Sequence, residues 1–459
     1  MNIDHFTVNK NSTFKECLSA IDKNKHGIIF ITDDQSIVVG ALTDGDIRDN
    51  LLKGALPEDK IQNKYNNTFV SATENTPLEH ILKRLDFDIK VIPILNQRGE
   101  LVDIASQQRV PLKNEKKIYA RAKAPVRVTF AGGGSDLYHY FESETGAVIN
   151  ATISLFCHAV LMLRDDKKIV IKSSDLNKSW DFLNFNHALD EADVDFGLFR
   201  SIIQAIKPDF GFELQVSSDF EKGSGLGGSS AVSAAIIGCF NEFRVDKWDD
   251  YDIAELAFQC ERIHMKVSGG WQDQYATVFG GFNFIEFKKD KNAVQPLRIN
   301  KKTLLELEES LLIYKIGSRN EYEGDDIHKD QKMTMKSDDI RDKVKNSVKL
   351  CYEMKEFLLR GKVTSFADGL NQAWMLKRQF GKIITNSEID SIYNFAIMNG
   401  ALGGKLMGAG GGGYFIFFVN PFKRTSFIDA MKQKNLEKTD FIFEKKGMQS
   451  SSYRVELDL

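Results

Sequence analysis

The sequence predicts an α+β protein in which a small duplicated module precedes a larger body. Residues 1–115 contain the same order of amphipathic helix and short strands twice. From residue 118 onward, apolar strands and long helices alternate irregularly, and several strands alternate in polarity, which favours α+β over a doubly wound parallel sheet. The length of 459 residues is enough for about three structural units.

Composition excludes several classes of partner. Lys and Arg number 61 against 64 Asp and Glu, a net charge of −3, so no general positive field exists for nucleic acid or an anionic membrane. The five cysteines form no C-x-x-C pair, which argues against a zinc site or a disulfide framework and fits a reducing cytoplasm. The polar N-terminus and the lack of an apolar run of about 20 residues predict a cytoplasmic protein.

Each half of residues 1–115 is predicted to combine a helix with two strands. The first half has a helix at 13–23, strands at 26–32 and 37–42, and a helix from Ile47. The second half has a helix at 78–85 and strands at 91–95 and 101–104. The polar segment 111–117 then separates this module from the rest of the chain.

The sequence Thr43-Asp44-Gly45-Asp46 stands between the second strand and the following helix. Two strands with a tight turn and then T-x-x-D at a helix entrance resemble a CBS domain pair. The resemblance implies that Thr43 and Asp46 contact the ribose and phosphate of a regulatory nucleotide. The second half has Asp103-Ile104-Ala105-Ser106 instead, so one of the two nucleotide sites retains the pattern. The alternative is that Asp46 only caps the helix; in either case we expect a regulatory or dimerising module and a homo-oligomer.

The strongest chemical signal is the glycine-rich stretch at residues 223–231, which precedes an apolar helix. Glycines let backbone N–H groups turn inward, and a helix start adds the positive end of its dipole, so this loop can hold phosphate. A capped helix after a flexible loop is the alternative. The residues expected to bind the nucleotide are Gly223, Ser224, Gly225, Leu226, Gly227, Gly228, Ser229 and Ser230.

Two other phosphate motifs do not fit this loop. The spacing G-x-G-x-x-G is present, but residues 218–222 separate it from the preceding strand, and no acidic strand end follows about 20 residues later. The Walker A sequence G-x-x-x-x-G-K-[ST] is absent. The loop therefore fits neither a Rossmann fold nor a P-loop fold.

Two further glycine clusters accompany the first. Gly408–Gly413 precedes a strand, so it has no helix dipole; it permits close backbone approach to a ligand or to the first loop, unless it is only a tight turn. Ala131–Asp136 follows a strand at 123–130 and ends in a carboxylate suited to binding sugar hydroxyls.

Taken in order, these three segments resemble the motifs of the GHMP kinases over residues 118–459. The resemblance implies a lobe like ribosomal protein S5 domain 2 at 118–300, a ferredoxin-like lobe at 301–459, and ATP between them. The chain is most similar to D-glycero-D-manno-heptose 7-phosphate kinases in three segments: Phe130–Asp136, Gly269–Tyr275 and Ala401–Leu406.

The resemblance also assigns chemical roles. Asp273 matches the catalytic aspartate, as the base or as the group that orients the attacking hydroxyl. Arg127 matches a Lys or Arg that lies near this aspartate and the γ-phosphate. Glu261 matches the Mg²⁺ ligand, with Ser230 as its partner. A helix N-cap for Asp273 and a surface salt bridge for Arg127 are the structural alternatives.

Substrate binding is expected at the other two glycine clusters, through Gly133, Gly134, Ser135, Asp136, Lys405, Gly410 and Gly411. A sugar phosphate also requires cationic groups, and the candidates are Arg319, Lys377, Arg378 and Lys405.

The implied reaction is ATP- and Mg²⁺-dependent phosphorylation of the anomeric hydroxyl of heptose 7-phosphate, for nucleotide-activated heptose and surface polysaccharide synthesis. One alternative is a kinase for an unphosphorylated sugar such as fucose. Another is a sugar and nucleotide sensor without catalysis, against which the presence of Asp273, Glu261, Ser230 and Arg127 argues.

Overall fold

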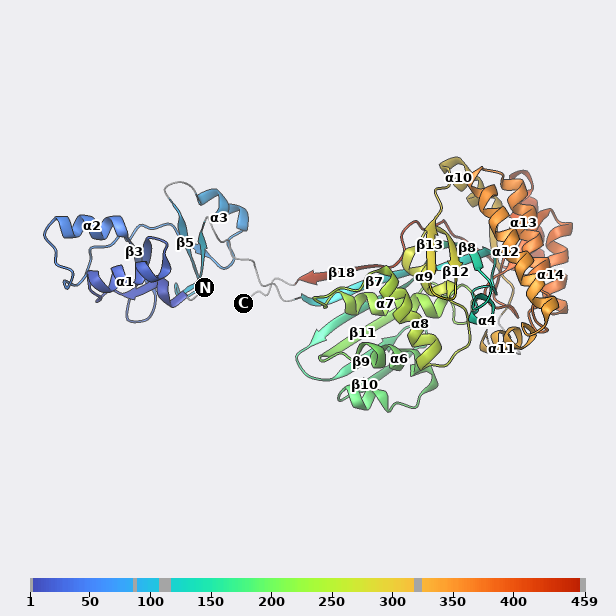
Figure 1. The fold of residues 1–459 in the computed structure, drawn as a ribbon, viewed down its shortest axis with the longest axis horizontal. Coiled ribbons are helices and arrows are strands. Elements are labelled where there is room, and N and C mark those ends of the chain that lie inside the picture. Colours follow the sequence, from blue (N-terminus) through green and yellow to red (C-terminus); the bar gives the residue numbers. More distant parts are fainter. Residues whose placement is uncertain (1–2, 86–88, 107–116, 318–323, 455–459) are drawn as a thin grey trace. The chain divides into compact units, whose positions relative to one another are not determined.

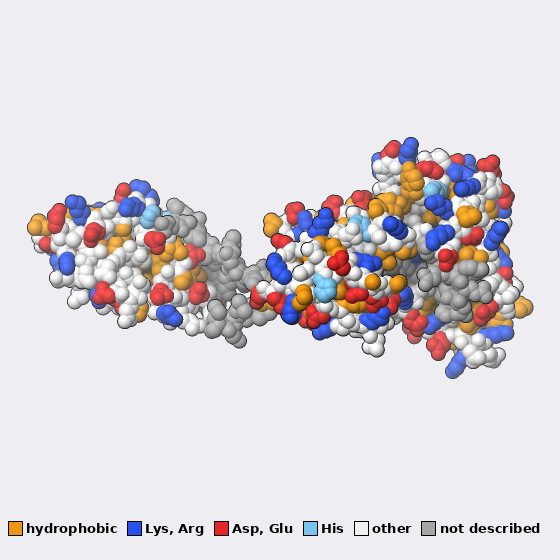
Figure 2. All heavy atoms as spheres, turned by 90° about the horizontal axis from the view of Figure 1, so that it is seen from below, with side chains coloured by type: hydrophobic (Ala, Val, Ile, Leu, Met, Phe, Trp, Pro, Cys, Tyr) orange, Lys and Arg blue, Asp and Glu red, His pale blue; other side chains and the backbone are white. Residues whose placement is uncertain are grey.

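The computed structural model describes residues 3–85, 89–106, 117–317 and 324–454. The chain divides into two compact units, residues 1–114 and 115–459, which are described separately (Figure 1). Within the described residues, no helix combines the length and apolarity needed to cross a membrane. Acidic and basic side chains are interspersed over the face shown in Figure 2, in keeping with the near-balance of charge in the sequence.

The first unit contains two three-stranded sheets of the same design. In each sheet the first two strands are parallel and the last two antiparallel, with a helix between the first and second strands, so the predicted duplication is confirmed. The elements of the first half are η1 (Ile3–Phe6), β1 (Thr7–Asn9), α1 (Phe14–Asn24), β2 (Ile28–Thr32), β3 (Val38–Thr43) and α2 (Asp44–Leu52). Those of the second half are β4 (Ala72–Thr73), α3 (Leu78–Arg84), β5 (Val91–Leu95) and β6 (Leu101–Ser106).

Capping boxes set the starts of both helices in the first half. Thr13 caps α1 together with Glu16, and the helix buries Phe14, Cys17 and Ile21 along one face. Helix α2 starts at Asp44, so the predicted start at Ile47 is wrong. The reason is that Thr43 is its N-cap: Asp46 N donates to Thr43 Oγ1 at 3.1 Å, and Thr43 N donates to Asp46 Oδ2 at 2.9 Å.

The second unit is built on an eight-stranded sheet and a four-stranded antiparallel sheet. In the larger sheet the order is β10-β9-β11-β8-β12-β13, and β7 joins β8 to β18. Its strands are β7 (Lys117–Ala131), β8 (Gly146–Arg164), β9 (Ile169–Ser173), β10 (Lys178–Phe182), β11 (Gly211–Ser218), β12 (Phe282–Phe287), β13 (Asn292–Pro296) and β18 (Gln449–Arg454). The smaller sheet has the order β15 (Ala401–Leu406), β16 (Tyr414–Val419), β14 (Leu311–Lys315) and β17 (Lys438–Thr439).

Helices cover both sheets. Helices α7 and α9 pack on β7 and β8, and α12 and α13 pack together, with α13 against β15 (Figure 1). The helices of this unit up to α9 are α4 (Tyr138–Phe141), α5 (Phe185–Leu189), η2 (Val194–Phe196), α6 (Gly197–Ile206), α7 (Gly228–Asn241), α8 (Asp250–Phe258), the π-helix η3 (Gln259–His264) and α9 (Gln272–Phe279). Those that follow are α10 (Lys301–Ser310), α11 (Gly324–Thr334), α12 (Asp338–Leu359), α13 (Val363–Lys377), α14 (Ser387–Met398), η4 (Pro421–Lys423) and α15 (Arg424–Gln433).

Strand β18 connects the end of the described chain to the first sheet of this unit. It pairs antiparallel with β7, and the rings of Tyr119 and Tyr453 stack 5.0 Å apart. The division into lobes at 118–300 and 301–459 remains an interpretation, and β18 is a part of the second range that belongs to the sheet of the first.

Candidate active site

The glycine loop before α7 positions two serines against a buried glutamate. Gly227 is the N-cap of α7 with a φ of +81°, and no side chain caps the helix, so a serine-capped helix is not what the structure contains. Instead, Ser229 Oγ donates to Glu261 Oε2 at 2.5 Å, and Ser230 Oγ donates to Oε1 at 2.8 Å. The loop, the helix start and Glu261 therefore form one group.

Glu261 projects from the π-helix η3 and is 2% exposed. It also accepts a hydrogen bond from Gln274 Nε2 at 2.9 Å. Among the described residues no cluster of three or more His, Cys, Asp or Glu side chains could hold a metal. One carboxylate with two neighbouring hydroxyls is nevertheless an all-oxygen set of the kind that Mg²⁺ uses, because Mg²⁺ takes few protein ligands and completes its shell with water and phosphate.

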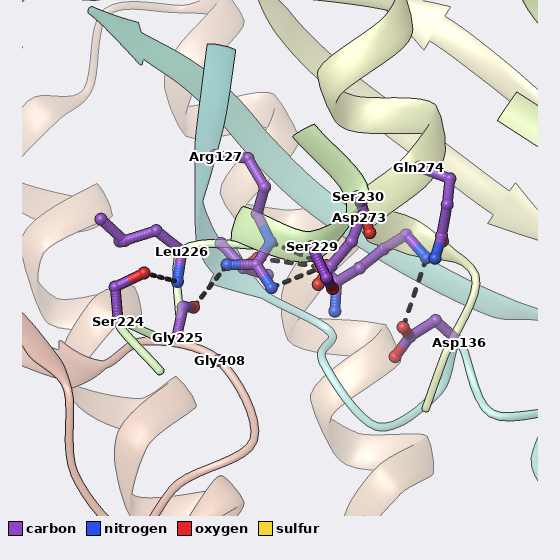
Figure 3. A network of polar contacts seen from close by, with 12 residues as sticks. Arg127, Asp136, Ser224, Gly225, Leu226, Ser229, Ser230, Asp273, Gln274 and Gly408 are labelled. Atoms are coloured by element: carbon purple, nitrogen blue, oxygen red, sulfur yellow. Dashed lines mark hydrogen bonds and ion pairs between the residues drawn. The ribbon is translucent and has the colours of Figure 1, made fainter. Parts of the chain in front are cut away.

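The buried Arg127 and the partly buried Asp273 form an ion pair beside the same loop. Arg127 Nε and Nη2 lie 2.8 and 2.6 Å from Asp273 Oδ1, and Nη1 donates to the Gly225 carbonyl at 2.7 Å. Figure 3 shows the guanidinium between the two. With Arg127 only 3% exposed, the pair is not a surface salt bridge, and Asp273 does not cap α9, whose N-cap is Trp271.

Asp136 connects the loop Ala131–Asp136 to the segment that carries Asp273. Its Oδ1 accepts from Gly134 N at 2.9 Å and its Oδ2 from Gln272 N at 3.4 Å. A Cβ on Gly270 would lie 1.8 Å from Oδ2, so only glycine fits there. Burial, and then the nearby Asp273 carboxylate, raise the pKa of Asp136.

The third glycine cluster packs directly on the first. A Cβ on Gly408 would lie 2.6 Å from Gly225 Cα, and one on Gly413 would lie 2.5 Å from the Ser224 carbonyl oxygen. The structure therefore contains the predicted close approach of this cluster to the first loop. Lys377 Nζ donates to the Gly408 carbonyl and so connects α13 to the contact.

Lys405 lies on β15 and is 2% exposed. Its Nζ donates to the Thr129 carbonyl at 2.9 Å. Thr129 lies on β7, two residues before the loop Ala131–Asp136 begins. Burial, then the nearby charges of Lys377 and Arg127, lower its pKa well below the ordinary value, and Asp136 opposes this. Lys405 and Lys377 are therefore both near the glycine loops.

Other predicted phosphate and substrate contacts have protein partners or lie outside the described residues. Arg378 forms an ion pair with Asp390, and Arg319 lies outside the described residues. Ser135 is fully buried, and its hydroxyl donates to the Gly132 carbonyl at 2.7 Å and accepts from Ala147 N at 3.0 Å, so it supports its own loop.

The remaining substrate-side glycines have protein neighbours. A Cβ on Gly133 would lie 3.8 Å from Gln272 Nε2, and one on Gly134 would lie 3.3 Å from the Phe380 ring. Gly410 approaches the Ile384 carbonyl, and Gly411 approaches Ile327 of α11. These glycines bring the loops close to α11 and residues 380–384.

Sequence reasoning missed three polar residues around this centre. Gln274 binds Glu261, Arg262 lies next to it, and His328 comes from α11. Burial and then Arg262 lower the pKa of His328, to about 4, while Asp273 raises it, which places His328 in the same electrostatic environment. Gln274 directly follows Asp273 and Arg262 directly follows Glu261, and this adjacency could have indicated both residues. The sequence gives no comparable sign for His328.

Comparison with known proteins agrees with this geometry. Residues 197–281 match the GHMP kinases N terminal domain, residues 354–438 match GHMP kinases C terminal, and residues 1–53 match the CBS domain. A D-glycero-alpha-D-manno-heptose 7-phosphate kinase of Campylobacter jejuni is 38% identical over 337 residues, which cover 72% of this chain and 98% of that kinase.

A solved structure gives the same result. A D-glycero-D-manno-heptose 1-phosphate kinase from Bacteroides thetaiotaomicron superposes with a TM-score of 0.61 at 28% identity, covering 73% of this chain and all of that one. The predicted fold and the predicted CBS resemblance are thereby confirmed. The chain belongs to the GHMP kinases, as a sugar kinase with a CBS domain at its N-terminus.

Proposed function

We propose that this chain transfers the γ-phosphoryl group of ATP to the anomeric hydroxyl of D-glycero-D-manno-heptose 7-phosphate, which yields the 1,7-bisphosphate. The observation that carries the proposal is the 38% identity to a heptose 7-phosphate kinase over nearly its whole length. The product would enter nucleotide-activated heptose and surface polysaccharide synthesis in the cytoplasm. The paired Arg127 and Asp273 beside the glycine loop support the reaction class.

In this proposal Asp273 receives the proton of the anomeric hydroxyl or orients that hydroxyl. Both contacts from Arg127 go to Asp273 Oδ1, so we assign Oδ2 to the substrate. Arg127 stabilises negative charge on the transferred group, and Asp136 with Lys405 binds the sugar. The N-terminus of α7 and residues 223–230 bind the phosphates of ATP.

Glu261 and Ser230 would hold Mg²⁺, with Ser229 beside them. Bound Mg²⁺ supplies charge neutralisation to phosphate oxygens. The two hydroxyls donate to the carboxylate in the structure, and binding of the ion would require them to turn their lone pairs toward it.

For the N-terminal module, residues 1–115, we propose binding of an adenine or sugar nucleotide that changes kinase activity or oligomeric state. The CBS match at residues 1–53 and the position of Thr43 and Asp46 at the start of α2 support this. At least a quarter of this chain has no counterpart in the Campylobacter jejuni relative, since that kinase matches only 72% of it.

A coupled ADP-release assay over a substrate panel tests the proposed reaction. The panel contains D-glycero-D-manno-heptose 7-phosphate, the corresponding 1-phosphate, sedoheptulose 7-phosphate, mannose 6-phosphate, fucose and mevalonate. Turnover of the 7-phosphate alone, with a product phosphorylated at C1, is the expected result. Preferred turnover of fucose or of the 1-phosphate would overturn the proposed substrate while leaving the sugar kinase assignment intact.

A further inference from the structure

Arg262 is a buried cation that the chemistry above does not use. It follows Glu261 in the π-helix η3, and its side chain is 14% exposed. Its Nε atom is buried and has no hydrogen-bond partner in the described parts of the chain. A buried guanidinium N–H group without a hydrogen-bond partner is costly, because it has lost water.

The neighbouring carboxylate does not satisfy this side chain. Glu261 Oε2 lies 3.9 Å from Arg262 Nη1, beyond hydrogen-bonding distance, and already accepts the Ser229 hydroxyl at 2.5 Å. Arg262 is therefore adjacent to the oxygen set at the start of α7 without being bonded to it. Short π-helical segments such as this one occur frequently at functional sites.

Gly269 keeps the guanidinium in this position. A Cβ at Gly269 would lie 2.4 Å from Arg262 Cζ and 2.5 Å from Nη2, so any larger residue displaces the guanidinium. Gly269 begins the same segment that carries Asp273. The contact with Arg262 thus lies four residues before Asp273 in the chain.

The surroundings of Arg262 carry charges of both signs, since Glu261 Oε2 lies 3.9 Å from its Nη1 and both Arg262 and Asp273 act on the nearby His328. His328 is uncharged near neutral pH because burial and then Arg262 lower its pKa to about 4, and Lys377 acts in the same direction. A guanidinium whose buried Nε has no hydrogen-bond partner among the described residues can bind an anion there. In the proposed reaction, the γ-phosphoryl group of ATP would lie beside Asp273 and Ser229.

We propose that Arg262 binds a non-bridging oxygen of the γ-phosphoryl group, as a second guanidinium in addition to Arg127. This inference rests on the proposed transfer at Asp273, but not on the identity of the sugar. A planar guanidinium suits the purpose because it can donate two parallel hydrogen bonds to phosphate oxygens.

The test uses the full chain with Arg262→Gln, Arg262→Lys and Gly269→Ala. Arg360→Gln is the matched control, since Arg360 forms an exposed pair with Glu356 on α12. Titration calorimetry gives affinities for ADP and for the non-hydrolysable β,γ-imido analogue of ATP, and steady-state assays give kcat with whichever sugar is turned over.

We expect Arg262→Gln to lower kcat about 100-fold, comparable to loss of one donor to a transition-state oxyanion. It should lower the affinity for the ATP analogue about tenfold, while the affinity for ADP changes by less than about twofold, since only the analogue has a γ-phosphate. Gly269→Ala should also weaken binding of the analogue more than binding of ADP, because it displaces the Arg262 guanidinium without removing its charge.

Equal losses for ADP and the analogue would indicate a structural role and overturn the inference. So would unchanged kcat, or an effect confined to the KM of the sugar phosphate, which would assign Arg262 to the substrate's own phosphate. Because the two nucleotide affinities need no sugar, failure of the heptose assignment would leave this result readable. If Arg262→Gln does not fold, Arg262→Lys and Gly269→Ala decide the question.

Discussion

Gly408→Ala tests whether the third glycine cluster acts through contact with the first. In the structure, a Cβ at this position would lie 2.6 Å from both Gly225 Cα and its carbonyl oxygen, whereas ordinary contact starts at 3.4 Å. Neither loop can accommodate the methyl group by rotating a side chain, because the opposing atoms are backbone. The substitution must separate the two loops.

The cost can be worked out in two parts. Gly408 has a φ of +65°, and an L-residue in this region costs about 1–2 kcal/mol. Overpacking a close contact costs about 1–3 kcal/mol more. Gly223→Ala is the matched control: its φ is +81° but its Cβ would have nothing within 4 Å, so it should show only the first cost.

The catalytic effect follows from the Gly225 carbonyl, which accepts a hydrogen bond from Arg127 Nη1 at 2.7 Å. If Gly225 moves, Arg127 and Asp273 move or lose this support. A displacement of about 1 Å in a catalytic group can cost about 100-fold in rate, and we expect a loss of this order in kcat.

Tryptophan fluorescence during urea unfolding measures the stability part, since all four tryptophans lie in the unit 115–459 and the module 1–114 has none. Gly408→Ala should lose about 2–5 kcal/mol and Gly223→Ala about 1–2 kcal/mol. Equal stability losses in the two variants, with kcat of Gly408→Ala close to that of the parent, would refute the reasoning.

Three other predictions concern charge. Asp273→Asn should keep the affinity for the ATP analogue but lower kcat by about 10²–10⁴-fold, as loss of a general base does; near-normal turnover would contradict its role. The pKa of His328 is about 4 in the folded chain against 6.5 ordinarily, so only the unfolded chain gains this proton as pH falls from 6.5 to 4. The free energy of unfolding should therefore decrease by about 3 kcal/mol over that window, and urea titrations of His328→Gln should not show this decrease. Adenine or sugar nucleotides should change the kinetics or the light-scattering mass of the full chain and not of Asp46→Asn; no change in either would contradict regulation.

The sequence predicted the elements that have local signals. Periodicity and turn residues located β5 at Val91–Leu95 as the structure has it. The start of α2 was misplaced because Asp44, Gly45 and Asp46 are poor helix formers, and the capping box that stabilises them depends on side-chain geometry. Strand β18 was not predicted, since its polar sequence Gln-Ser-Ser-Ser-Tyr-Arg becomes a strand only by pairing with β7.

The site shows the same limit in another form. The resemblance places Arg127 near Asp273, but the two positions are 146 residues apart, and the residues alone give no sign of their pairing. Arg262 has no motif of its own. Its potential role became visible because a glycine next to it leaves room for a guanidinium and because the adjacent Glu261 is already occupied by two serines. A residue whose partner is a ligand has no partner in the sequence, so a buried polar atom without a hydrogen bond in the described chain, here Arg262 Nε, is the physical sign that identifies it.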